Sequence, residues 1–339
     1  MPFSRRGFLK ASIAVLASIA MPLKLRWVEA APYNFGQGRA TKRSVQTYNR
    51  PSLSGEKREA LERDTVFNIA GVTVGDEKPA HNRVWYLLEN GAFVHSGPIQ
   101  PVRTTLNRPR LELPTGGLLA EVTVPLTLAR WGPSTEFAVA YRMYYSSAHW
   151  LTRVLAQPDG QVWYRLYDDR RRLSYWGQAE HFRPISRKEL APIHAQVAPE
   201  EKWIRVDRTN QVLTAYEGER QVYQARTATG AVFSTGDFTT PHGIFMSSRK
   251  RPSRHMAGGD INAEDWFDLP GVPWVSYLTK GGVAIHGTYW HNDYGRPRSH
   301  GCINVTPEAA KWIYRWTRPH VPATKSQMWE DEGTRVEVI

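Results

Sequence analysis

The single cysteine of this 339-residue chain lies close in sequence to two histidines. His286 follows the apolar run 283–285, and Cys302 closes the segment Ser299-His300-Gly301-Cys302, which is separated from Thr288 by ten residues. A cysteine attacks a carbonyl carbon as its thiolate, and a nearby imidazole promotes that state by taking the thiol proton or by standing beside the anion as a cation. These residue types at this spacing therefore predict nucleophilic catalysis by Cys302.

Two glycines beside the histidines leave space for a substrate. Gly287 and Gly301 carry no side chain, so a substrate backbone can approach closely there. The backbone amides of Gly301 and Cys302 are candidate donors to a developing oxyanion. His286 ends a predicted strand, which would hold it rigidly, whereas His300 shares a face with Cys302 in an extended strand but need not do so in a tight turn.

The elements around these residues are predicted to be mostly strands. Residues 203–206 and 211–216 alternate apolar and polar side chains, which predicts two strands with one buried face. One helix is predicted over 308–316, because Thr306 is a suitable N-cap and Pro307 suits the first helical position. The C-terminal part is therefore expected to be a β domain with little helix.

A long loop is predicted over 249–276, in which Gly258, Gly259, Pro270 and Pro273 are the signals. A loop of this length inside a compact domain is usually functional. Its basic run 249–255 ends in His255, which we expect on an exposed face or, as the alternative, in contact with substrate carboxylates.

Residues 65–190 have the pattern of short strands separated by turn residues. Asn90-Gly91 between two apolar runs is a strong hairpin signal. The motif Val84-Trp85-Tyr86 is echoed at Val162-Trp163-Tyr164, which predicts two related β modules, at 65–105 and 113–190. The polar and basic stretch 32–64 ahead of them is predicted to be a linker with one short helix near 56–63.

Several motifs in the last part of the chain resemble the L,D-transpeptidase (YkuD-type) catalytic domain. They are His286-Gly287-Thr288, SHGCIN at 299–304, Thr229-Gly230, TPHGxF at 240–245 and Gly333-Thr334-x-Val336. The resemblance covers about 200–339 and implies a β-sandwich or barrel with one or two short helices, so the fold class is mainly β. The two modules ahead of it resemble bacterial SH3-like β-barrels, which bind peptides or wall polymer.

The resemblance implies a role for each residue near the cysteine. Cys302 is the nucleophile, and His286, oriented by the Gly287 carbonyl, is the general acid and base. His300 helps to set the environment of the thiolate, and the amides of Gly301 and Cys302 form the oxyanion hole. The implied substrate-binding residues are Ser299, Asn304, Tyr277 and Trp274, with the last two near the donor peptide and 249–276 as a lid.

The implied reaction is a two-step acyl transfer on peptidoglycan. Cys302 forms a thioester with a tetrapeptide stem and releases D-Ala, and an amine of another stem then takes the acyl group in a 3→3 cross-link. Water as the acceptor would make the protein an L,D-carboxypeptidase, and a wall-binding protein without catalysis is the other alternative. The family needs no metal or organic cofactor.

A zinc site is the rival interpretation of the same residues. His286, His291, His300 and Cys302 are side chains of the kinds that bind zinc. The His-x-Cys spacing is not that of a common zinc motif, and His291 lies in a polar stretch, where we expect a solvated histidine. A buried, inert thiol is the remaining interpretation of Cys302.

The N-terminus predicts export. Residues 4–10 read SRRGFLK and precede an apolar stretch over 11–23, which resembles a twin-arginine signal and predicts a signal peptide over 1–31. The expected location is the periplasm or cell wall, or the membrane surface if the signal is not cleaved. No apolar run reaches the roughly 18 residues of a spanning helix, which excludes a polytopic membrane protein.

The chain is basic, with 44 Lys and Arg against 32 Asp and Glu and a net charge of +12. Such a charge favours anionic partners. No nucleic-acid-binding motif accompanies it, so we expect anionic wall polymer or the carboxylates of stem peptides as partners, no nucleic acid, and a monomer.

Overall fold

The computed structural model describes residues 36–259 and 266–339. Strands dominate these residues, which confirms the predicted mainly β fold class. The predicted signal peptide lies outside the described residues. Within them, no helix has the length and apolar character needed to cross a membrane.

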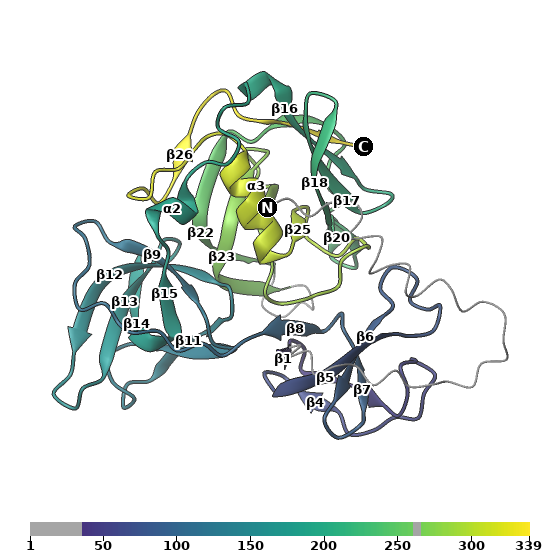
Figure 1. Ribbon diagram of the computed structural model, residues 1–339, viewed down its shortest axis with the longest axis horizontal. Coiled ribbons are helices and arrows are strands. Elements are labelled where there is room, and N and C mark those ends of the chain that lie inside the picture. Colours follow the sequence, from purple (N-terminus) through teal and green to yellow (C-terminus); the bar gives the residue numbers. More distant parts are fainter. Residues whose placement is uncertain (1–35, 260–265) are drawn as a thin grey trace. The chain divides into compact units, whose positions relative to one another are not determined.

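The first module is built on a six-stranded sheet in the order β3-β7-β6-β5-β1-β8 (Figure 1). Its strands are β1 (Gln37–Ala40), β3 (Thr47–Tyr48), β5 (Val66–Val74), β6 (Val84–Leu88), β7 (Phe93–His95) and β8 (Ile99–Val102), with β2 (Ser44–Val45) paired to β4 (Leu61–Glu62) beside them. The predicted linker is wrong over 37–62, because β1 lies between β5 and β8 and completes the sheet. No helix forms at 56–63. Strands of two to four residues are too short to show an alternating pattern in the sequence.

The second module is a seven-stranded antiparallel sheet in the order β11-β10-β14-β13-β12-β9-β15. Its strands are β9 (Leu118–Val122), β10 (Leu126–Arg130), β11 (Val139–Tyr144), β12 (Ala148–Ala156), β13 (Val162–Asp168), β14 (Leu173–Gln178) and β15 (Phe182–Pro184). Trp85 of the first module and Trp163 of the second are both fully buried, so the repeated motif marks a core position in each. The SH3-like character of the modules stays a prediction.

Three short helices join or follow these sheets: η1 (Ala179–His181), α2 (Arg187–Leu190) and η2 (Pro199–Glu201). The α2 turn begins with a capping box, in which Ser186 accepts a hydrogen bond from the Glu189 amide and the Glu189 side chain accepts from Ser186. The connection therefore enters the C-terminal domain through ordered turns.

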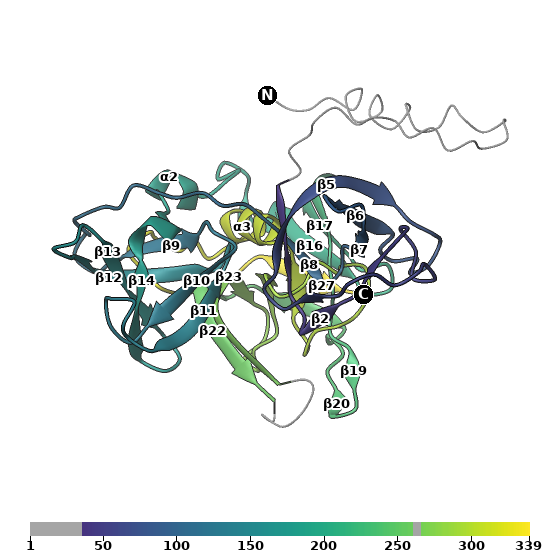
Figure 2. The same cartoon turned by 90° about the horizontal axis from the view of Figure 1, so that it is seen from below.

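The C-terminal domain contains two five-stranded sheets, in the orders β18-β17-β16-β27-β21 and β25-β24-β23-β22-β26. The first consists of β16 (Lys202–Asp207), β17 (Val212–Glu217), β18 (Arg220–Arg226), β21 (Gly243–Met246) and β27 (Arg335–Val338). The second consists of β22 (Arg249–Gly258), β23 (Phe267–Tyr277), β24 (Ala284–Gly287), β25 (Ile303–Val305) and β26 (Met328–Trp329). A separate small hairpin, β19 (Val232–Phe233) with β20 (Gly236–Asp237), projects from the domain in Figure 2.

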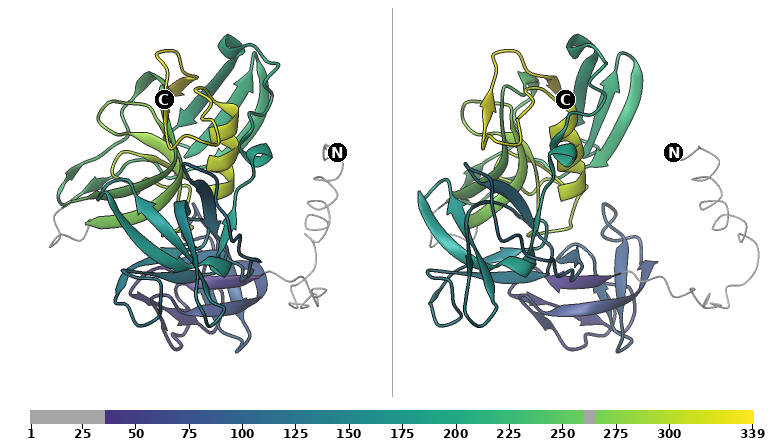
Figure 3. Two further views of the ribbon diagram at one scale, coloured as in Figure 1. Left: turned by 90° about the vertical axis from the view of Figure 1, so that its left-hand side faces the viewer. Right: turned by 60° about the vertical axis from the view of Figure 1, so that its left-hand side comes forward.

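Helix α3 (Pro307–Trp316) lies between these two sheets, as Figures 1 and 3 show. Its N-cap Thr306 accepts a hydrogen bond from the Ala309 amide at 3.2 Å, and Pro307 occupies the first position, so the predicted helix is confirmed. Its buried face shares one core with Ile204 of the first sheet and Ile285 of the second. Each such buried aliphatic side chain contributes roughly 2 kcal/mol to the free energy of unfolding, so packing against α3 holds the two sheets together.

The loop predicted over 249–276 is wrong, because β22 and β23 pair there as a long antiparallel hairpin. Gly258, Pro270 and Pro273, which suggested a loop, lie within these strands, and Gly259 directly follows β22. Gly271 and Trp274 have φ angles of +70° and +61°, and the pairing register shifts between Arg254 and Met256. These irregularities bend the hairpin, and they hid two long strands from pattern analysis.

Candidate functional site

Parallel pairing of β24 with β25 brings Cys302 and His286 to neighbouring strands. His286 is the register partner of Asn304, and Cys302 lies two positions before Asn304, directly ahead of β25. Side chains two positions apart in an extended strand point the same way, so Cys302 lies on the side of the strand pair that His286 faces. The topology therefore joins two residues that lie on either side of the 289–298 segment.

The thiol of Cys302 is half-buried and neutral in this structure. Its Sγ lies 3.7 Å from the carbonyl oxygen of Gly282, to which the thiol donates. Burial raises the pKa of Cys302 to about 11, and a backbone hydrogen bond from Ala284 opposes this only weakly. A thiol in this state needs a base before it can attack.

His286 has the state that a base requires. Its side chain is buried, and Nδ1 lies 3.1 Å from the Gly287 carbonyl oxygen. Burial lowers the pKa of His286 to about 4, so the ring is neutral near pH 7. Because a carbonyl only accepts, Nδ1 carries the proton and donates it to Gly287, which leaves Nε2 unprotonated and able to accept.

The turn before Cys302 is held by a buried hydroxyl. Gly301 has a φ angle of +101°, which side chains strongly disfavour. Thr240 donates to the Gly301 carbonyl at 2.9 Å and accepts from the Gly230 amide at 2.8 Å. These bonds fix the peptide that carries the candidate oxyanion donors.

Ser299 also shapes this turn. Its hydroxyl donates to the carbonyl oxygen of Cys302, and its amide donates to the Thr229 carbonyl at 3.0 Å. The structure thus gives the Ser299 side chain an internal partner, whereas the sequence predicted a substrate contact.

Asn304 and His291 form a buried pair next to the candidate site. The Asn304 amide group lies 3.1 Å from Nε2 of His291, and both side chains are almost fully buried. Nδ1 of His291 accepts from the Asp293 amide, so the neutral ring carries its proton on Nε2. The Asn304 atom that faces Nε2 is the side-chain nitrogen, also a donor, and the Asn304 oxygen has no partner among the described residues, so turning the amide by 180° supplies the acceptor that Nε2 requires. The prediction of a solvated His291 is wrong, because this stretch folds back over β25. Asn304 points at His291, not at a substrate position.

His300 lies against three aromatic rings. Its ring stacks on Phe233 at 4.8 Å between centroids, meets Phe238 at 4.7 Å, and lies 5.1 Å from Phe267. These rings come from the β19–β20 hairpin and its flank and from the start of β23. His300 is therefore part of an aromatic wall next to the Gly301 turn.

Tyr277 and Trp274 lie on different sides of β23. Tyr277 belongs to the buried cluster that Cys302 packs against, and the Arg249 guanidinium lies 3.9 Å from its ring centroid. Trp274 packs instead in the main core, 5.4 Å from Tyr314, with Lys311 over its ring. Trp274 is almost fully buried in this core and has a positive φ angle of 61°, and its predicted place near a donor peptide stays a prediction.

Sequence reasoning missed Trp290, whose ring is a neighbour of the His286 ring. The two ring centroids are 5.8 Å apart, and Trp290 packs against the same cluster as Cys302. A half-buried tryptophan beside the base is a natural wall for a substrate backbone. Its position two residues after Thr288 was the available signal.

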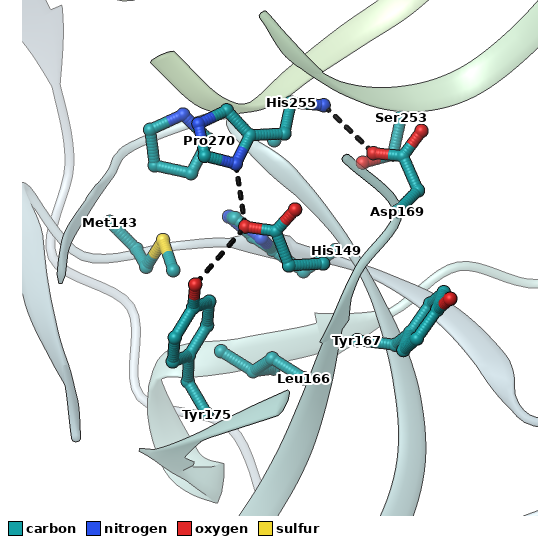
Figure 4. A pocket seen from close by; sticks show the side chains of 11 residues that line it. Met143, His149, Leu166, Tyr167, Asp169, Tyr175, Ser253, His255 and Pro270 are labelled. Atoms are coloured by element: carbon teal, nitrogen blue, oxygen red, sulfur yellow. Dashed lines mark hydrogen bonds and ion pairs between the residues drawn. The ribbon is translucent and has the colours of Figure 1, made fainter. Parts of the chain in front are cut away.

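His255 lies in a polar cluster away from the cysteine (Figure 4). Its Nδ1 bonds Asp168 of β13 at 2.5 Å, and its Nε2 bonds Asp268 of β23. Only a doubly protonated ring can donate to two carboxylates, so His255 is an imidazolium. The exposed position that the sequence predicted is wrong, because the second module covers this part of β22.

The described residues contain no group of three or more His, Cys, Asp or Glu arranged to hold a metal ion. His286, His291, His300 and Cys302 are all among them. His286 lies in β24 and Cys302 directly precedes β25, and the His286 ring is oriented by its hydrogen bond to the Gly287 carbonyl.

The C-terminal domain matches a known family. Residues 201–338 match the family model described as YkuD, the L,D-transpeptidase catalytic domain. A curated relative, the putative L,D-transpeptidase YciB of Bacillus subtilis, is 27% identical over 122 residues, which are 33% of this chain and 59% of the relative. The chain thus spans under two thirds of that relative's length.

Solved structures of L,D-transpeptidases are also similar to this chain. The catalytic domain of the E. faecium L,D-transpeptidase is 25% identical, with 41% of this chain and 98% of that chain covered and a TM-score of 0.31. An L,D-transpeptidase from Mycobacterium smegmatis is 20% identical, with coverages of 53% and 90% and a TM-score of 0.34.

Proposed function

We propose that this protein is an exported L,D-transpeptidase that uses Cys302 to cross-link peptidoglycan stems. The observation that carries the proposal is a neutral, buried His286 with Nδ1 bound to Gly287, on the strand beside a neutral thiol. Such a pair can move one proton from sulfur to Nε2 when a substrate carbonyl arrives.

In the first step the thiol turns from the Gly282 carbonyl towards His286. Nε2 takes the proton, and Sγ attacks the carbonyl carbon of the diamino-acid residue in a tetrapeptide stem. The oxyanion accepts hydrogen bonds from the amides of Gly301 and Cys302. When the C–N bond breaks, His286 returns the proton to the amine of the departing D-Ala, and a thioester remains on Cys302.

In the second step an amine of another stem attacks the thioester. His286 accepts a proton from that amine, the C–S bond breaks, and the thiolate regains the proton. The products are a 3→3 cross-linked dimer and the resting enzyme. Trp290, Tyr277 and the aromatic wall at His300 exclude water from the thioester, which favours an amine over hydrolysis.

Muropeptide analysis tests this proposal. The full chain incubated with disaccharide-tetrapeptide is expected to give dimers one D-Ala lighter than two monomers, and Cys302→Ala is expected to give none. Intact-mass spectrometry is expected to show a carbapenem adduct on the wild type only. A product consisting of tripeptide alone would identify an L,D-carboxypeptidase, and the absence of product and adduct would support a non-catalytic wall-binding protein.

The export proposal rests on the paired arginines of the N-terminal motif. Substitution of Arg5 and Arg6 by lysine is expected to leave the protein in the cytosol, because twin-arginine export requires the pair. Cell fractionation measures this, and unchanged export of the double variant would contradict it.

A further inference from the structure

A cavity of about 340 Å³ lies between the first module and the 289–298 segment of the catalytic domain. Its lining combines charged and apolar side chains. The charged and ionisable ones are Lys42, His81, His95, Asp293, Arg296 and Arg298. The segment that forms its catalytic-domain wall begins three residues after His286.

Positive charge exceeds negative charge in this lining. Asp293 is its single carboxylate, and both oxygens of Asp293 are already bonded. Oδ2 accepts from Arg296 and Arg298 at 2.7 and 2.8 Å, and Oδ1 lies 2.9 Å from Nε2 of His81. The lining therefore contains three cations, Lys42, Arg296 and Arg298, against one carboxylate, even with His81 and His95 counted as neutral.

Lys42 is the cation left over. Its side chain is exposed, and it makes no ion pair or hydrogen bond with any residue that the structure describes. Partial desolvation, together with Arg298 and Arg296, lowers the pKa of Lys42, and Asp293 opposes this lowering. Like charges gathered in a partly enclosed space repel more strongly than in water. An anion bound between Lys42 and Arg296 would relieve this repulsion.

The remaining walls suit a peptide better than a polyphosphate chain. Val45, Tyr48 and Leu53 line one side, and Pro79 and Pro98 line another. Leu53 is 51% exposed, which leaves apolar surface for a ligand side chain. A ligand with both a carboxylate and an aliphatic part satisfies the charge and the walls together.

The cavity is also connected to the catalytic strands. Asp293 donates its amide to His291, and His291 bonds Asn304, the register partner of His286. A ligand bound to the 289–298 segment is therefore connected, through Asp293, His291 and Asn304, to the β24–β25 strand pair next to Cys302.

We propose that this cavity binds the carboxylate of a peptide, with Lys42 and Arg296 as the principal donors. The identification of that peptide as a stem of peptidoglycan rests on the proposed function, whereas the binding itself does not. A phosphate-bearing wall polymer carries a related anion and forms the other arm of the test.

Isothermal titration of the full-length Cys302→Ala protein, which cannot turn over, tests the proposal. The probes are the free stem tetrapeptide, the same peptide with its carboxylates amidated, and inorganic phosphate. Lys42→Gln and Arg296→Gln are each expected to weaken tetrapeptide binding about tenfold, because a charge-assisted hydrogen bond is lost. Arg43→Gln, an exposed neighbour outside the cavity, is the matched control and should bind as the parent does.

The amidated peptide separates this cavity from the catalytic cleft. Amidation is expected to weaken binding to the parent protein, and to matter much less in Lys42→Gln, where the charge partner is already gone. Equal tetrapeptide affinity in the parent and both variants would overturn the proposal, and tighter binding of phosphate than of tetrapeptide would overturn its ligand class. Carbapenem adduct formation on the wild type reports the proposed function separately, so the two failures can be told apart.

Discussion

At the scale of single residues, the protonation states of two side chains decide the chemistry. The pKa of Cys302 is raised to about 11 and that of His286 is lowered to about 4, both by burial. Between these values the resting pair is thiol and neutral imidazole, not thiolate and imidazolium. The proposed reaction therefore uses general-base catalysis, in which the thiol loses its proton only when the substrate is bound.

Alkylation measures the resting thiol directly. We expect the rate of iodoacetamide reaction at Cys302 to rise about tenfold per pH unit from pH 7 to 10, because the thiolate fraction grows in that way below a pKa near 11. Stopped-time mass spectrometry of the intact protein gives these rates. A plateau of fast alkylation already at pH 6 would show a stable ion pair and contradict this prediction.

His286→Gln tests the base. Its amide NH₂ can still donate to the Gly287 carbonyl, but it cannot take a proton at neutral pH. We expect carbapenem acylation to slow by about 10²–10⁴-fold, and the wild-type rate to fall below about pH 4, where His286 becomes protonated. A variant that folds normally by thermal melting and keeps more than a tenth of the rate would exclude His286 as the base.

At the scale of elements, the Gly301 turn depends on one buried threonine. Thr240→Val keeps the shape but removes both the donor to Gly301 and the acceptor for Gly230. We expect a loss of about 2 kcal/mol in the free energy of unfolding and a slower acylation step, because the oxyanion donors are no longer fixed. Urea unfolding and adduct kinetics measure the two effects.

Thr240→Ser is the matched control, since it restores the hydroxyl and loses one methyl group. It should recover most of the acylation rate. If serine and valine slow acylation equally, the effect comes from packing and not from these two hydrogen bonds.

At the scale of the whole molecule, the second module is joined to the β22–β23 hairpin by ionic contacts. His255 lies between Asp168 and Asp268, and Asp169 pairs with Arg251 and Arg254. These contacts link elements whose residues lie more than 80 positions apart, apart from the local pair of His255 and Asp268. Deletion of the module would expose this buried charge.

The pH dependence of stability follows from this cluster. Burial lowers the pKa of His255, but its bonds to Asp168 and Asp268 outweigh burial and raise it overall. Burial likewise raises the pKa of both aspartates, and the bonds from His255 contribute most to the net lowering. Other groups that face the cluster are Tyr141, Tyr175, Arg171 and the neutral, buried His149. The His255 backbone amide donates a hydrogen bond to Asp169.

Because the pKa of His255 is raised on folding, its protonation stabilises the folded state. This stabilisation is fully present below about pH 6.5, the pKa of an unfolded histidine, and is lost as the pH rises through the pKa of His255 in the folded protein. The lowered aspartate values add stability that is lost as the pH falls below about 4. We expect the difference in melting temperature between wild type and His255→Gln to be largest between these limits and to shrink above pH 7. A difference that does not change with pH would contradict the charged state of His255.

Local signals were sufficient for part of this account. Thr306 and Pro307 predicted the start of α3, because a helix cap depends on neighbouring residues. The SHGC segment and His286 predicted the candidate site, because these residues form short motifs that can be recognised in the sequence. The strands over 37–62 and the β22–β23 hairpin were missed, since their pairing partners lie elsewhere in the chain and their prolines and glycines suggested loops.

The sequence by itself determined which thiol and which histidines were available and that the chain is mainly β. Only the tertiary structure decided that Trp274 and Asn304 face inward, that Ser299 bonds Cys302, and that His255 is charged while His286 is neutral. The physical reason is that burial and long-range partners set both orientation and pKa. A residue's partners come from strands that are distant in sequence, and no local pattern records them.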